Sequence, residues 1–483
     1  MEAIQEVKPA VVAHPTVEER RARGKELRKR TPPSSHGDWK PAADRPDPVE
    51  LLAEQDARRE PDLVPVRHGR MAVSPFTFYR GAARIMATDL KDTPRAGLGV
   101  QLCGDAHLSN FGVFASPERV LLFDVNDFDE TLPGPFEYDV KRMAASFTIA
   151  ARNNGFGKAD TRSATLASVE AYRTAMADFA KEGVMAIWYA RLSEADMAAA
   201  VKSLEHTEKG KAKKAVKRDE KAAAHSAAKA ETHDSLQALS KLGELVDGRY
   251  RIKSQPPIVV PARELLATYG ISPDTVQQGI HDMFRAYRAT LQPDRRHLLE
   301  NFEIVDIARK VVGVGSVGTR CFIVLLQGRD EGDPLFLQVK EATASVLEDH
   351  LPRSRFRQPG QRVVEGQRLM QAASDIYLGW TKGVQENRYF YYRQLRDMKG
   401  SAAVESMAPG ALSFYARECG WSLARAHARS GDPIAMAAYL GKSDAFDKAV
   451  TEFSERYADQ NERDYKTFTA AIRSGRLQAK SGV

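Results

Sequence analysis

A short stretch around residue 105 combines residue types that suit the chemistry of magnesium and phosphate. Asp105 follows the apolar run 98–102, and Asn110 ends the turn after it. A carboxylate can orient an attacking hydroxyl and accept its proton, while Mg²⁺ takes oxygen ligands from carboxylates and amide carbonyls. We therefore predict that Asp105 orients the acceptor and that Asn110 and Asp127 hold the metal.

Two short strands are predicted to bring further acids back to Asp105. Residues 111–115 and 119–125 are rich in apolar side chains, and the sequence between them is typical of a turn. A hairpin of this size brings its two ends together, and its second strand delivers three acids there: Asp124, Asp127 and Asp129. The alternative interpretation is a capped turn with acids at solvated strand ends, but the number of acids favours the metal site.

The sequence GDAHLSN of residues 104–110 resembles the catalytic loop of the protein-kinase-like superfamily, especially its aminoglycoside- and choline-kinase branch. By that resemblance Asp105 matches the catalytic base, Asn110 a metal ligand and Asp127 the metal-binding aspartate. Asp124 is the alternative counterpart, and Asp129 is held in reserve. The segment PGPFEYDVKRMAAS resembles the helix start that follows the metal motif, where Asp139 matches an aspartate. The resemblance implies ATP and Mg²⁺ as cofactors.

A closer likeness covers most of the chain after the first seventy residues. The run from SPFTFYRGAA through NDFDE to VKRMAAS resembles an uncharacterised bacterial family known as domain of unknown function 2252. This resemblance indicates a family for the chain, but it implies no activity because the family is uncharacterised.

Residues 303–341 form a second region that can meet phosphate. Strands are predicted over 303–312, 320–327 and 335–341, and the turn between the first two reads GVGSVG. A dinucleotide-binding fold needs a helix directly after such glycines, whereas β-branched and aromatic residues follow them here. We predict a β-hairpin whose turn covers phosphates with four residues: Gly313, Gly315, Ser316 and Gly318.

Lys340 lies on the third of these strands, in the sequence LFLQVKEA. The kinase resemblance implies that a lysine on this strand contacts the nucleotide phosphates. Residues 360–373 are predicted to form a helix, and Glu365 on it is the predicted partner that holds Lys340, with Glu348 in reserve. The alternative is a plain glycine hairpin with a lysine at a strand end.

The two motifs stand in the opposite order to that of ordinary kinases, because the acidic loop precedes the glycine turn. We therefore predict an α+β, two-lobed protein-kinase-like fold whose motif order is circularly permuted, which termini lying close together would permit. Residues 301–398 would form a small antiparallel β lobe. Residues 74–300, with a charged helical insert near 195–240, and residues 399–483 would form a mainly helical large lobe, preceded by a polar arm over 1–73.

Several local elements follow from periodicity and capping signals. Helices are predicted over 17–29, 138–151, 160–181, 262–293 and 412–429, and a hinge over 397–400. Ser74-Pro75 starts another helix, on which Arg80 and Arg84 lie one turn apart. In an ATP site these arginines could meet phosphate, but positions at the surface are favoured. His427 is expected to be structural.

Composition excludes several classes of protein. The 483 residues carry a net charge of +7, but the basic residues cluster near 20–30 and 209–221, which favours solvated faces over nucleic-acid binding. Three scattered cysteines cannot build a disulfide framework and indicate a cytoplasmic location. No apolar run reaches about eighteen residues, so no membrane span is predicted.

The leading hypothesis is an ATP- and Mg²⁺-dependent phosphotransferase that acts on a small-molecule or protein hydroxyl. Three alternatives remain open: a kinase-fold adenylyl transferase, a catalytically inactive nucleotide-binding or scaffold protein, and a metal-dependent hydrolase that uses the acids of residues 124–129. The predicted partners are a nucleotide and a hydroxyl acceptor whose identity the sequence does not encode.

Overall fold

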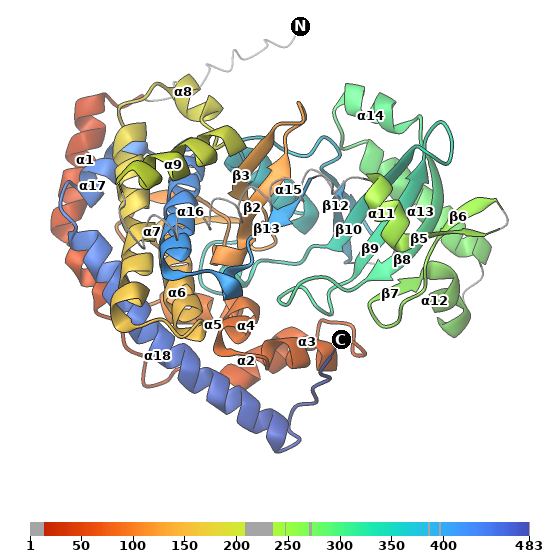
Figure 1. The fold of residues 1–483 in the computed structure, drawn as a ribbon, viewed down its shortest axis with the longest axis horizontal. Helices are drawn as coiled ribbons and strands as arrows, with labels where there is room; N and C mark the ends of the chain where they lie inside the picture. The colour runs from red at the N-terminus through yellow and green to blue at the C-terminus, as the bar shows by residue number, and fades with distance from the viewer. Residues whose placement is uncertain are drawn as a thin grey trace, which may run out of the picture.

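A computed structural model describes residues 14–207, 235–246, 248–269, 273–384, 387–395 and 398–482. Over this part the chain is an α+β fold, as predicted. Helices gather at one end, and a six-stranded antiparallel sheet lies at the other (Figure 1). In the described residues no helix is long and apolar enough to cross a membrane.

The six-stranded sheet has the strand order β11-β12-β10-β9-β8-β7. Its strands are β7 Val259–Pro261, β8 Glu303–Lys310, β9 Cys321–Gln327, β10 Pro334–Glu341, β11 Gly379–Lys382 and β12 Tyr389–Gln394. The three strands predicted around the glycine turn are therefore confirmed as β8, β9 and β10. Both faces of strand β10 are covered, so seven of its eight residues are buried, including the polar residues Gln338, Lys340 and Glu341.

Helices cover both faces of this sheet. They are α11 Ser235–Leu242, α12 Ala262–Tyr269, α13 Pro273–Arg288, α14 Pro293–Leu299 and α15 Pro359–Met370. Tyr287 of α13 stacks on Tyr392 of β12 with ring centroids 3.9 Å apart. The helical segment predicted over 262–293 contains two helices, α12 and α13, and ends where α14 begins. A small hairpin of β5 Gly243–Val246 and β6 Arg249–Ile252 lies beside α11.

Two small sheets carry the acidic loop. β1 Gly99–Leu102 pairs with β4 Leu132–Pro135, and β2 Phe111–Ala115 pairs with β3 Leu121–Val125. The predicted hairpin after Asn110 is therefore confirmed. β13 Gly400–Ser401, from much later in the chain, pairs with β2. The predicted hinge over 397–400 begins outside the described residues.

Helices from both ends of the chain form the helical end. α6 Glu137–Asn153, α7 Lys158–Phe179, α8 Val184–Tyr189 and α9 Glu194–Thr207 meet α16 Pro409–Ser430, α17 Pro433–Leu440 and α18 Ala445–Arg473. α16 crosses α7 at Gly420, where an added Cβ would lie 2.2 Å from the backbone oxygen of Ser168. Residues 208–234 of the predicted insert lie outside the described part of the chain.

Five helices near the start of the chain pack on the body, three from the predicted arm and two from the start of the predicted large lobe. They are α1 Val17–Arg30, α2 Pro48–Asp56, α3 Val64–Met71, α4 Pro75–Gly81 and α5 Ala83–Leu90. Thr16 and Glu19 form the capping box of α1, which confirms the predicted basic helix. Ser74 caps α4 as predicted, but the helix breaks at Ala82. The chain end returns to this arm, because Lys480 N donates to Pro65 O at 2.7 Å.

Candidate active site

A cavity of about 440 Å³ lies between the arm, the acidic loop and the glycine turn. Its wall contains carboxylates and arginines from segments far apart in the sequence. The acidic loop contributes Asp105, Asn110, Asp127 and Asp129, and the glycine turn contributes Gly313, Gly315 and Ser316. The two predicted regions therefore meet at a single cavity.

The turn that presents Asp105 depends on Gly104 and Asp139. Gly104 has φ of +87°, and an added Cβ would lie 2.2 Å from the backbone oxygen of Glu130, so only glycine fits. Asp139, in the first turn of α6, accepts hydrogen bonds from Cys103 N at 2.7 Å and Gly104 N at 3.0 Å. His427 Nε2 lies 3.3 Å from the same carboxylate. His427 thus has the structural environment expected from the sequence.

Asp139→Asn is expected to lower the free energy of unfolding by about 1–3 kcal/mol, because one of the two buried backbone N–H groups then faces an amide NH₂ instead of an acceptor. Urea unfolding of the wild type and the variant measures the difference. Equal unfolding midpoints would contradict the role of Asp139 as the support of the Gly104 turn.

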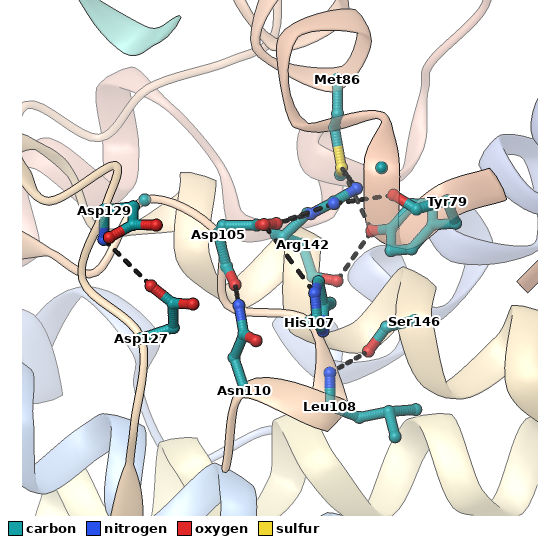
Figure 2. A network of polar contacts seen from close by, with 12 residues as sticks. Tyr79, Met86, Asp105, His107, Leu108, Asn110, Asp127, Asp129, Arg142 and Ser146 are labelled. Atoms are coloured by element: carbon teal, nitrogen blue, oxygen red, sulfur yellow. Dashed lines mark hydrogen bonds and ion pairs between the residues drawn. The ribbon is translucent and has the colours of Figure 1, made fainter. Parts of the chain in front are cut away.

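The Asp105 carboxylate lies between Arg142 and the cavity (Figure 2). Its Oδ1 accepts from Arg142 Nε at 2.8 Å, and the guanidinium stacks 3.8 Å from the ring centroid of Tyr79. Burial raises the pKa of Asp105, although Arg142 opposes the change. A carboxylate with a raised pKa holds a proton more tightly and is a better general base.

His107 and Asn110 flank Asp105 in the same turn (Figure 2). Asn110 Nδ2 donates to Asp105 O at 2.8 Å, which leaves its amide oxygen as the atom suited to a metal. His107 Nε2 lies 3.8 Å from Asp105 Oδ2. Burial, together with Arg142 and Arg80, lowers the pKa of His107 well below its usual value, so this imidazole is neutral.

Lys340 projects from β10 toward the acidic loop. Its Nζ lies 2.5 Å from Asp129 Oδ2 and 3.7 Å from Asp127 Oδ2. Tyr391, which pairs with Lys340 from the neighbouring strand β12, donates to Asp129 Oδ1 at 2.6 Å. Burial by itself lowers the pKa of Lys340, but Asp127 and Asp129 outweigh it and raise the pKa. The lysine is therefore a permanent cation beside the predicted metal ligand.

The predicted pairing of Lys340 with Glu365 is wrong. Glu365 lies on the flank of α15, where its carboxylate is 3.4 Å from Arg368 Nη1. The face of α15 that meets the acidic loop carries Arg362 instead, whose Nη2 donates to Asp129 O at 2.7 Å. The reserve partner, Glu348, caps Ser345 N and also does not hold Lys340.

The reserve metal ligand Asp124 does not face the cavity. It is 1 % exposed, and its Oδ1 accepts from Arg425 Nη2 at 2.6 Å. Its Oδ2 accepts from Ala372 N at 2.8 Å. From β3, Asp124 therefore pairs with Arg425 of α16 in the core. Of the two candidates Asp124 and Asp127, it is Asp127 that lines the cavity.

The residues present fit a metal shared with a nucleotide. Among the described residues no group of three or more His, Cys, Asp or Glu side chains could hold a metal ion. In phosphate sites, however, Mg²⁺ is commonly held by one or two protein oxygens together with substrate phosphates. Asn110 and Asp127 supply such oxygens, whereas both oxygens of the reserve ligand Asp129 are engaged by Lys340 and Tyr391.

The glycine turn lies against the arm. Gly313 and Gly318 adopt φ of +64° and +88°, and an added Cβ at Gly315 would lie 3.1 Å from the backbone oxygen of Arg80. Gly313, Gly315 and Ser316 line the cavity as predicted, whereas Gly318 packs on Arg59 and is not part of the wall. The arm therefore covers this turn, which the sequence did not indicate.

Four arginines near the start of the chain line the cavity although none was predicted as a site residue. Arg80 and Arg84 were expected at the surface but line the cavity, as do Arg58 and Arg59 of the arm. Burial lowers the pKa of Arg59 to about 9. The spacing of Arg80 and Arg84, one helical turn apart, was the available signal for that pair.

Glu130, which also lines the cavity, predicts a pH effect on stability. Burial raises its pKa from 4.5 to about 7. Between these values the folded chain holds a proton that the unfolded chain has lost, so this group destabilises the fold as pH rises. Glu130→Gln should therefore gain stability relative to the wild type between about pH 5 and about pH 8. Urea unfolding at both pH values tests this, and a constant difference would contradict it.

Comparison with known proteins gives one match. The model of a family described as uncharacterized protein conserved in bacteria (DUF2252) matches residues 59–471. No curated protein and no solved structure matches the chain.

Proposed function

The chain belongs to the DUF2252 family of bacterial proteins, and we propose that its cavity is the site of an ATP- and Mg²⁺-dependent phosphotransferase. The observation that carries the proposal is the approach of Lys340 Nζ to within 3.7 Å of Asp127 Oδ2. These residues belong to the two regions that the sequence singled out for phosphate chemistry.

Each side chain then has a task in phosphoryl transfer. Asn110 and Asp127 would hold Mg²⁺, which when bound neutralises charge on the β- and γ-phosphates. Lys340 contacts the phosphates, and the turn of Gly313, Gly315 and Ser316 covers them with backbone N–H groups. The acceptor hydroxyl approaches Asp105, which orients it and takes its proton as its oxygen attacks the γ-phosphorus.

The arrangement of elements supports a permuted, two-lobed kinase-like fold. Residues 301–398 include five strands of the sheet and α15, and correspond to a small lobe. After it the chain returns to the helical end, where β13 pairs with β2 and α16 packs on α7. We therefore assign 74–300 and 399–483 to one large lobe, and we propose a cytoplasmic protein because its three cysteines are free.

The contacts weigh against the metal-dependent hydrolase. That hypothesis needs the acids of residues 124–129 as a cluster of ligands. Arg425 binds Asp124, and Lys340 binds Asp129, so only Asp127 is left. Adenylyl transfer and nucleotide binding without turnover use the same cavity, and an experiment on the products separates them.

The test is ³¹P NMR of ATP incubated with the full chain, Mg²⁺ and a small-molecule extract of bacterial cells. Phosphoryl transfer predicts ADP and a new phosphate-ester resonance, both absent with Asp127→Ala. Formation of AMP and pyrophosphate would show adenylyl transfer instead. Unchanged ATP in the presence of folded wild-type protein would contradict the proposed enzyme.

A further inference from the structure

The cavity wall contains arginines to which the proposed nucleotide site gives no role, alongside the carboxylates of the acidic loop and of residues 341–349. Five arginines line it: Arg58, Arg59, Arg80, Arg84 and Arg353. They come from the segment after α2, from α4 and α5, and from the segment before α15. Lys340 is separate from this group, because Asp129 and Asp127 already surround it.

Arg80 is the least compensated of the half-buried arginines. Its Nε is buried and has no hydrogen-bond partner among the described residues. Its nearest acid is Glu405, 4.0 Å from Nη1, and that side chain is 54 % exposed. An ion pair of this length with an exposed acid contributes little. The Arg80 guanidinium, which lines the cavity, therefore has no strong counter-ion, and burial lowers its pKa.

Arg84 lies beside Arg80 on the next helix. Its Nη2 is 3.0 Å from Glu54 and its Nε is 3.2 Å from Asp349, and both acids are about half exposed. These contacts orient the Arg84 guanidinium at the cavity wall, and both of its acidic partners stay exposed to solvent. An incoming anion can compete with exposed carboxylates for such a group at small cost.

The position of Arg80 assigns it to the acceptor side of the cavity. The charges that act on it are Glu405 and Asp105. It also acts on His107, whose buried Nδ1 has no hydrogen-bond partner among the described residues. The side chain of Arg59, by contrast, donates to Val317 O and packs on Gly318, whereas Arg80 approaches the glycine turn at Gly315 through its backbone oxygen.

Building on the proposed function, we propose that Arg80 and Arg84 bind a phosphate group of the acceptor, so that the substrate is a small phosphorylated alcohol. Guanidinium groups match phosphate oxygens in geometry and charge. A cationic acceptor of the aminoglycoside or choline kind would meet the guanidinium groups of Arg80 and Arg84. A cavity of about 440 Å³ favours a small molecule over a protein surface.

The reaction balances with these components alone. The acceptor hydroxyl oxygen forms a bond to the γ-phosphorus of ATP, and the bond between that phosphorus and the β–γ bridging oxygen breaks. Asp105 takes the hydroxyl proton and releases it to solvent. The products are ADP and an acceptor that carries two phosphate groups.

The experiment is calorimetric titration of inorganic phosphate into the full chain saturated with AMP-PNP and Mg²⁺. We expect the wild type to bind phosphate, and Arg80→Gln and Arg84→Gln each to weaken it about tenfold or more. The affinity for AMP-PNP should stay within about twofold in both variants. The matched control is Arg456→Gln, which removes a surface ion pair between Arg456 of α18 and Asp38. It should change neither affinity.

Two results would overturn the inference while leaving the proposed function intact. One is a wild-type AMP-PNP complex that takes up no phosphate, or takes up acetate or choline in its place. The other is a loss of AMP-PNP affinity in Arg80→Gln and Arg84→Gln as large as the loss of phosphate affinity. If wild-type protein fails to bind AMP-PNP at all, the proposed function is overturned as well. The wild-type titration decides the matter even if a variant does not fold.

Discussion

Asp105→Asn is expected to lower kcat for phosphoryl transfer by about 10²–10⁴-fold and to leave the KM for ATP nearly unchanged. The amide cannot accept the proton of the acceptor hydroxyl, whereas the nucleotide contacts assigned to Lys340 and the glycine turn remain. The fold should survive, because the amide oxygen can still accept from Arg142, which also donates to Tyr79 O at 2.9 Å. Steady-state kinetics at saturating ATP measures the effect.

Asp178→Asn is the matched control for this prediction. Asp178 is an exposed residue of α7 that pairs with Lys181, and its replacement should leave kcat at the wild-type value. Wild-type turnover by folded Asp105→Asn would show that another group accepts the proton. Circular dichroism melting of both variants separates lost chemistry from lost folding.

Lys340→Met should cost about 3–5 kcal/mol of stability and abolish nucleotide binding. The change leaves the Asp129 carboxylate, which Lys340 contacts at 2.5 Å, without its cation in a buried site. Tyr391 still donates to the other oxygen, but a neutral donor does not replace the lost charge. Urea unfolding and titration with AMP-PNP measure the two effects separately.

The double variant Lys340→Met/Asp129→Asn distinguishes structural from functional loss. With the unpaired charge removed, most of the lost stability should return, so the two changes are strongly non-additive. Nucleotide affinity should stay low, because the cation for the phosphates is still missing. A stable single variant, or a double variant with wild-type affinity for AMP-PNP, would contradict the role given to Lys340.

Local patterns predicted the two regions of the site well. The strands around the glycine turn are short, apolar and separated by turn residues, and such signals depend only on neighbouring residues. The hairpin after Asn110 is of the same kind. The proximity of Lys340 and Asp127, in contrast, was expected only because each motif resembled part of one known catalytic arrangement.

The errors concern which side of an element meets its neighbour. Periodicity identified the helix around Glu365, but the loop meets the face of Arg362 and Gly366, where an added Cβ at Gly366 would lie 2.4 Å from Thr131. Asp124 looked equivalent to Asp127 in the sequence. Its partner Arg425 lies in a distant helix, and no local pattern encodes such a contact.

The arm shows a different limit of sequence reasoning. Its polar composition predicted a separate arm, yet it supplies Arg58 and Arg59 to the cavity, beside Arg80 and Arg84 from the start of the predicted large lobe. Arginines can be partly buried when their stems pack on apolar groups and their heads face a polar space. Arg80, for example, places its guanidinium 5.8 Å from the ring centroid of Phe76. Composition alone does not separate this arrangement from a solvated surface.

The binding of AMP-PNP to wild type and Asp127→Asn, each with Mg²⁺ and with EDTA, tests the shared metal and nucleotide site most directly. We predict that Mg²⁺ tightens binding to the wild type about tenfold or more, and that this gain largely disappears in Asp127→Asn. Wild-type protein that does not bind the nucleotide, or an equal gain from Mg²⁺ in both proteins, would contradict the account.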